Sequence, residues 1–141
     1  MTVHLANATA RVACDAINAL IDAGGGAGKL QIYSGTRPAT ADDAPSGTLL
    51  VEFAFAATAF GASAQVGNGA TATANAIASV TAAATGTATW FRVLAFDDDV
   101  IFDGSVTATG GGGDLQLSTV SIAAGIDVSV VSLTATMPEG V

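Results

Sequence analysis

The sequence predicts a mainly β fold, an antiparallel β-sandwich or barrel of about seven short strands with one amphipathic α-helix at the N-terminus. Three observations support this fold class. Only residues 8–23 have clear helical periodicity, much of the remaining chain alternates apolar and polar residues, and glycine-rich segments separate the alternating runs. The 141 residues are expected to form one domain, 1–141.

The helix is predicted over residues 8–23, after an N-terminal arm of residues 1–7. Its polar side chains recur on one side, at Arg11, Asp15, Asn18 and Asp22. We expect this stripe to face solvent, with Arg11 and Asp15 paired across one turn. The apolar side, which includes Val12 and Leu20, is expected to pack on the core.

Residues 29–138 are expected to form the β-domain. Alternation in KLQIYSG, TLLVEFAF and TATWFRVLAF predicts strands, and VIFDGSV follows a turn signal at 97–99 as a hairpin partner. Gly110 to Gly113 are expected to form a flexible break before the last strands. The apolar parity slips between Val130 and Val131, which predicts a bulge or a move between neighbouring strands.

Charged residues are scarce and mostly acidic. They make up 11% of the chain, with twelve Asp and Glu against four Lys and Arg and a net charge of −8. Because freestanding proteins usually carry more charge, we expect neighbouring subunits to cover much of the surface. Nucleic acids and anionic membranes attract clustered cations, so the acidic balance argues against both as partners.

The glycine-rich stretch from Gly24 to Lys29 invites comparison with a phosphate-binding loop. That motif requires Gly at its first position and Ser or Thr after the lysine, but Ala23 and Leu30 stand there. The motif also lies between a strand and a helix, whereas here the helix comes first. We therefore interpret the stretch as the connection between the helix and the first strand.

No catalytic constellation stands out, so we expect no enzyme activity, cofactor or small-molecule substrate. His4 is the only histidine and Cys14 the only cysteine. Cys14 is expected to be a small buried side chain, and a catalytic Cys–His pair is the alternative.

Two further sites have alternative interpretations. Asp97, Asp99 and Asp103 are weak candidates for a calcium site, because carboxylate oxygens bind this ion, but a solvated turn is favoured over that site. Arg92 is expected in a central strand with core packing around it, and a bridge to a partner subunit is the alternative.

Contacts with other subunits are expected from the N-terminal arm and from a long loop. The loop, residues 36–48, contains Pro and Asp residues and is the best candidate for a contact arm. The candidate interface residues are His4, Leu5, Arg37, Pro38, Asp42, Asp43 and Arg92.

Three segments resemble a family of small structural proteins of tailed bacteriophages: LQIYSGTRPATADDAPSGTLLVEFAF, TGTATWFRVLAFDDDVIFDGSV and DLQLSTVSIAAGIDVSVVSLTATMP. The similarity covers residues 8–138, and IYSGTRPATAD and GTATWFR are its most specific parts. The resemblance implies a virion role, with assembly in the cytoplasm of the host bacterium. It brings no catalytic motif with it.

The leading hypothesis is a capsid decoration (cement) protein that bridges capsomers on the outer shell surface and stabilises the head. Its expected partners are copies of itself, for example in a trimer, and a major capsid protein. A tail or head–tail connector ring protein is the first alternative. The second, from another class, is a carbohydrate-binding or adhesion module, which requires an exposed aromatic platform or a calcium site.

Overall fold

The computed structural model describes residues 3–67 and 69–138 and contains, within those ranges, one helix and twelve strands. The predicted mainly β fold with an N-terminal helix is confirmed, but the strands are more numerous than the expected number of about seven. The elements are α1 (Asn7–Ile21), β1 (Lys29–Tyr33), β2 (Leu49–Ala54), β3 (Ala64–Val66), β4 (Gly69–Thr73), β5 (Val80–Thr81), β6 (Gly86–Thr87), β7 (Trp90–Leu94), β8 (Val100–Ala108), β9 (Leu115–Leu117), β10 (Ser121–Ile122), β11 (Asp127–Val128) and β12 (Val130–Pro138).

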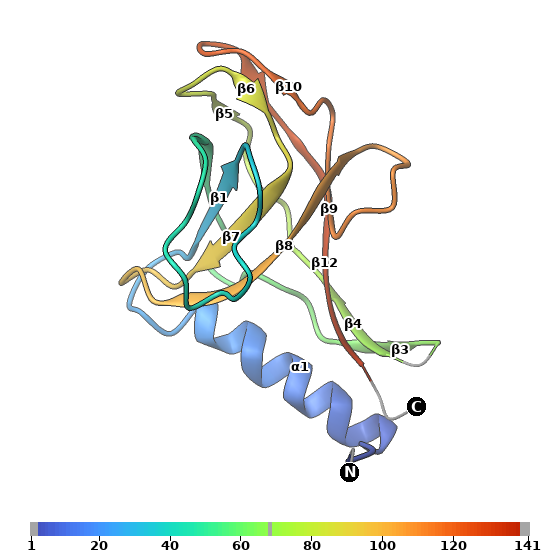
Figure 1. The fold of residues 1–141 in the computed structure, drawn as a ribbon. Coiled ribbons are helices and arrows are strands. Elements are labelled where there is room, and N and C mark those ends of the chain that lie inside the picture. Colours follow the sequence, from blue (N-terminus) through green and yellow to red (C-terminus); the bar gives the residue numbers. More distant parts are fainter. Residues whose placement is uncertain (1–2, 68, 139–141) are drawn as a thin grey trace.

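Eight strands form one curled sheet in the order β2-β1-β7-β8-β9-β12-β4-β3. Its neighbours are antiparallel except for β8 and β9, and the consecutive strands β7 and β8 form the predicted hairpin. The helix α1 lies beside β3, β4 and β12, at the opposite end of the molecule from the small pairs β5–β11 and β6–β10 (Figure 1). The architecture is that of a β-sandwich with a helix along one side.

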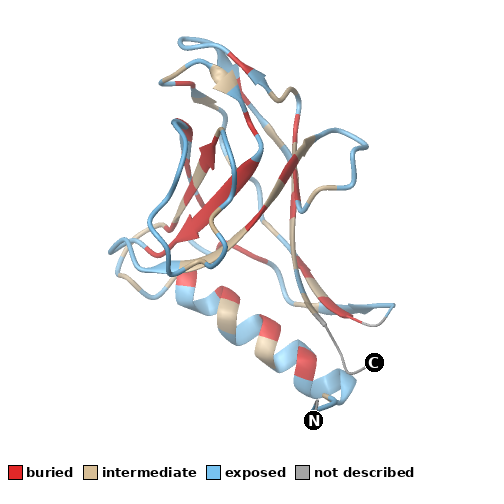
Figure 2. Ribbon diagram, in the orientation of Figure 1, coloured by how far each residue is buried: buried red, intermediate tan, exposed pale blue. Residues whose placement is uncertain are grey.

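The core lies in the concave side of this sheet. Strand β7 is buried along its whole length (Figure 2), because Phe91 and Val93 face the core while Trp90 and Arg92 lie under a loop on the other side. The strand is therefore covered on both faces, as its apolar residues predict.

The helix packs with a different side from the one that the sequence predicts. Ala10, Cys14, Asn18 and Ile21 are its buried residues. Val12 and Leu20, which were expected in the core, are 68% and 53% exposed. The helix also begins and ends earlier than the predicted 8–23, at Asn7 and Ile21.

The reason lies in the chain segment that runs beside the helix. Asp15 accepts a hydrogen bond from the backbone N–H of Ser63 at 2.8 Å, and Asp22 accepts one from Ala59 at 3.0 Å. These carboxylates satisfy backbone groups of the segment 59–63 that would otherwise lack partners, although Asp15 stays exposed and Asp22 is half-buried. The expected pair between Arg11 and Asp15 is not among the ion pairs of the described residues.

The segment Gly110–Gly113 is a hydrogen-bonded turn and not the flexible break that was expected. Gly110 and Gly112 have φ values of 83° and 81°, which glycine adopts readily, and the N–H of Gly113 donates to Thr107 Oγ1 at 3.0 Å. This turn lets β9 return parallel to β8 after a very short connection. Further on, the pairing register of β12 shifts between Val130 and Ser132, which confirms the predicted irregularity.

Candidate interaction surface

A buried ion pair organises the outer face of β7 and β8. Arg92 Nε donates to Asp103 Oδ1 at 2.7 Å and Arg92 Nη2 donates to Asp103 Oδ2 at 2.8 Å. The two residues face each other across the hairpin, and their side chains are only 3% and 6% exposed. This bidentate geometry is the strong form of a charge-assisted hydrogen bond, and it raises the pKa of Arg92. The geometry therefore favours the expected packing of Arg92 within its own chain, and its role as a bridge to a partner subunit stays a prediction.

Two stacked aromatic rings continue this layer. The rings of Tyr33 and Trp90 lie 4.5 Å apart between centroids with an interplanar angle of 12°. The guanidinium carbon of Arg92 lies 5.5 Å from the centroid of the Trp90 ring, within the range of cation–π attraction. Trp90 is 1% exposed and Tyr33 is 7% exposed, and burial raises the pKa of the Tyr33 phenol. The rings pack inside the protein and offer no open face to a ligand.

The loop 36–48 covers these rings and is fixed at several points. Arg92 Nη1 donates to the carbonyl oxygen of Asp43 at 2.9 Å, and the backbone N–H of Thr48 donates to Ser34 Oγ at 3.1 Å. Gly47 has a φ of 83°, and a Cβ there would lie 1.9 Å from the carbonyl oxygen of Ser34, so only glycine fits. The loop is thus held by hydrogen bonds against its own sheet, and its contact with another subunit stays a prediction.

A hollow of about 660 Å³ lies between this loop, the C-terminal end of α1 and the turn from β7 to β8. Leu20, Ala23, Val100 and Ile101 give it an apolar floor, and Leu20 and Val100 are 53% and 40% exposed. Its acidic lining residues, all exposed, are Asp42, Asp43, Asp97 and Asp99. We call this hollow the acidic groove, and Arg92 and Ala95 also contribute to its lining.

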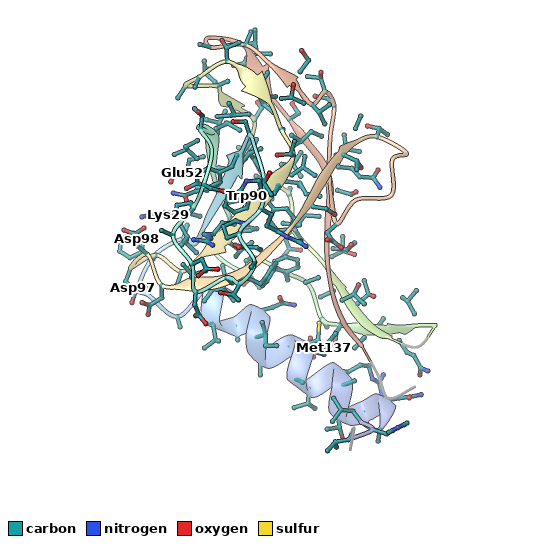
Figure 3. The ribbon with its side chains drawn as sticks, viewed as in Figure 1. Lys29, Glu52, Trp90, Asp97, Asp98 and Met137 are labelled. Atoms are coloured by element: carbon teal, nitrogen blue, oxygen red, sulfur yellow. The ribbon has the colours of Figure 1, made fainter. Side chains whose placement is uncertain are left out.

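The turn beside the groove is held by an ion pair and does not gather the calcium ligands considered above. Lys29 Nζ donates to Asp98 Oδ1 (Figure 3), and this hydrogen bond raises the pKa of Lys29. Asp98 has a φ of 71°, a conformation that Asp tolerates better than most residues. Asp103 is engaged with Arg92. Among residues 3–67 and 69–138, no group of three or more His, Cys, Asp or Glu is arranged to hold a metal ion, so the geometry gives the calcium alternative no support.

A smaller hollow of about 260 Å³ lies on the core side of α1, lined in part by Cys14 and Asn18. Asn18 Nδ2 donates to Cys14 Sγ at 3.6 Å, and Cys14 Sγ lies 3.7 Å from the carbonyl oxygen of Ala135. Burial raises the pKa of the Cys14 thiol, which therefore stays protonated at neutral pH and is a poor nucleophile. Cys14 is the small buried side chain that was expected.

The predicted interface residues fall at two ends of the molecule. Asp42, Asp43 and Arg92 all line the acidic groove. His4 and Leu5 precede α1, one helix length of roughly 22 Å from that groove. His4 is exposed, whereas Leu5 packs against the core of its own chain. Of the remaining two, Arg37 is exposed and Pro38 is half-buried.

Sequence reasoning missed the outward side of α1. Ala8, Val12, Ala16 and Leu20 follow one another at every fourth position, and all four are exposed. The signal was present, because the helix carries apolar residues on more than one side and only one side can face the core.

Comparison of the chain with protein-family models, with curated proteins and with solved structures finds no match. The described ranges contain no helix with the length and apolar character needed to cross a bilayer. The surface features described above are therefore the structural observations that bear on function.

Proposed function

We propose that this chain is a structural subunit of a tailed bacteriophage particle, a capsid decoration protein. In this role it binds the outer surface of the shell, bridges capsomers and stabilises the head. Its partners are a major capsid protein and further copies of itself. The resemblance of residues 8–138 to phage structural proteins and the low charge content support the proposal.

The apolar outer side of α1 is the observation that carries the proposal. Ala8, Val12, Ala16 and Leu20 form one continuous line along the helix, because residues four apart lie above one another. Val12 is 68% exposed and Leu20 is 53% exposed. Apolar residues exposed singly are common, but a continuous apolar line on a helix is typical of a surface that another subunit covers.

A second exposed feature lies beside the first. Strand β3 is an edge of the sheet, all three of its residues are exposed, and Val66 is 62% exposed. Figure 1 shows β3 next to the N-terminal half of α1. An open edge strand can pair with another chain, so this end of the molecule offers both apolar surface and free backbone groups.

The charge of the chain supports attachment to the outside of the shell. A net charge of −8 repels packaged DNA, which carries about one negative charge per 1.7 Å of duplex. The carbohydrate-binding alternative has less support, because the one Trp and the one Tyr of the chain are stacked on each other and buried. A tail or connector ring would use the same surfaces and differs in its position on the particle.

Particles purified from the source of this sequence provide the test. Mass spectrometry is expected to find the chain at many copies per particle, and cryo-electron microscopy is expected to place it on the outer shell. If microscopy instead places the chain in a ring at the head–tail joint, the protein is a connector and not a decoration protein. Absence of the chain from purified particles would contradict a virion role of either kind.

A further inference from the structure

We propose that the acidic groove is a docking site for an extended segment of another protein that carries Lys or Arg side chains beside small apolar ones. This inference rests on the proposed function for the identity of the partner, which would be the lattice protein. The binding property of the groove itself follows from its own lining and can be tested without any particle.

The charge of the groove selects a cationic occupant. Asp42, Asp97 and Asp99 are exposed, and no hydrogen bond or ion pair to their carboxylates is found among the described residues. Arg92 is the one cation in the lining, and its charge is matched by Asp103. Because potentials at an interface are complementary, a partner segment that enters here brings positive charge.

The floor of the groove adds an apolar requirement. Leu20 and Val100 are each at least 40% exposed and lie among Ala23, Ala95 and Ile101. The volume of about 660 Å³ lies within the range of roughly 300–1,000 Å³ that is typical of ligand pockets. The groove therefore has room for a few side chains, of which the apolar ones contact the floor and the cationic ones reach the rim.

The walls of the groove are already fixed before any partner binds. The carbonyl oxygen of Asp43 is held by Arg92, and the carboxylate of Asp43 accepts the backbone N–H of Thr40 at 3.1 Å. On the other wall, the carbonyl oxygen of Asp99 accepts the N–H of Ala95 at 2.9 Å. A preformed groove avoids the entropy cost of ordering two loops, and this favours binding of a short segment.

A second copy of this chain is a poor occupant. It would bring a further net charge of −8 to a rim of carboxylates. Of its four Lys and Arg residues, Lys29 and Arg92 are already paired within the chain. Like-charge contact at an interface is unfavourable, so the charge distribution favours a different, basic partner.

The test uses the full chain and a library of random linear peptides. Affinity selection on the immobilised chain is expected to enrich peptides that combine Lys or Arg with Ala or Val. The enriched peptides are then synthesised with a fluorescent label, and their binding is followed by anisotropy at low and at high salt. Enrichment of peptides without Lys or Arg, or of none, would overturn the proposal.

Matched variants then locate the bound peptide. Asp42→Asn with Asp99→Asn is expected to weaken peptide binding about threefold to tenfold, since each exposed ion pair contributes modestly. Asp114→Asn with Asp127→Asn changes the net charge equally but lies outside the groove lining, and it is expected to leave the affinity unchanged. Circular dichroism and thermal melting confirm that both variants fold. Equal affinity of wild type and groove variant would overturn the proposal.

Sedimentation equilibrium of the same proteins tests the competing occupant. Self-association that the groove variant abolishes and the control variant retains would assign the groove to a second copy and overturn the proposal. If the chain binds peptides with the predicted charge preference and yet is absent from particles, that outcome would support the groove as a docking site and contradict the virion role. The two proposals therefore fail separately.

Discussion

The two halves of the large sheet are covered by different parts of the chain. The half built from β1, β2, β7 and β8 carries the Trp, the Tyr and the buried Arg92, and its outer face is closed by the chain's own loop 36–48. Beyond β9, the other half is built from β12, β4 and β3, which are rich in Ala and Thr, and α1 covers its core side. The first half is self-contained, whereas the second leaves an apolar helix side and a sheet edge exposed. This difference suggests a division into a stable half and an interacting half.

The largest expected effect comes from breaking the buried ion pair of the aromatic half. Arg92→Leu leaves the Asp103 carboxylate buried without its partner, which is expected to lower the free energy of unfolding by about 3–5 kcal/mol. Urea denaturation followed by tryptophan fluorescence measures this loss. The double variant Arg92→Leu with Asp103→Leu is expected to recover much of it. A single variant as stable as wild type would show that the pair does not hold this half together.

Overpacking the small-residue half is expected to have the next largest effect. Ala72 on β4 is fully buried in the half that α1 covers. The larger side chain of Ala72→Leu pushes α1 away from β4, which is expected to lower the free energy of unfolding by about 1–3 kcal/mol. Ala64→Leu on the exposed strand β3 serves as the control and is expected to stay within about 0.5 kcal/mol of wild type. Equal tolerance at both positions would contradict close packing under the helix.

The hydrogen bonds between α1 and residues 59–63 are expected to contribute less to the free energy of unfolding. Asp22→Ala removes the acceptor of the Ala59 N–H and is expected to cost about 1 kcal/mol, the usual net value of one hydrogen bond. Asp22→Asn keeps an acceptor oxygen and is expected to remain closer to wild type. Thermal unfolding compares the three proteins, and an Asn variant as unstable as the Ala variant would indicate that the charge matters more than the hydrogen bond.

The smallest effect is the dependence of stability on alkaline pH. Burial raises the pKa values of Cys14 and Tyr33 above their ordinary values of 9.0 and 10.0. The unfolded chain therefore loses these protons first, and the native state binds more protons above pH 9.0, so stability falls as pH rises from there. Urea midpoints between pH 7 and pH 10.5 measure the slope. In Cys14→Ser the urea midpoint is expected to fall less at the start of this pH range. A midpoint that rises with pH would contradict the prediction.

Much of the fold followed from residue patterns, since the first strand begins at Lys29 and the last ends at Pro138, as predicted for the β-domain. Two-residue strands such as β5 and β6 were missed because a period of two cannot be detected over so short a run. The buried side of α1 was assigned wrongly, because Asn18 of the polar stripe is buried while the apolar Val12 and Leu20 are exposed. Asp15 and Asp22 also accept hydrogen bonds from backbone groups of a segment distant in sequence, and such pairing cannot be deduced from the helix alone.

The candidate surface was also predictable only in part. Asp42 and Asp43 were singled out because loops with Pro and Asp lie on surfaces, and they do line the acidic groove. Their meeting with Asp97 and Asp99 depends on how the loop folds back over β7, which is fixed by Arg92 and by the conformation of Gly47. No local pattern contains that information.

The most direct test of the outward helix side as a subunit contact is co-sedimentation with shells that lack this chain. Val12→Asp with Ala16→Asp places two charges on the exposed line outside the acidic groove, and Ala123→Asp with Ala124→Asp places two on exposed positions next to β10, at the opposite end. Wild type and the β10-side variant are expected to sediment with the shells, while the helix variant remains in the supernatant with unchanged thermal stability. Equal sedimentation of all three proteins would contradict the account.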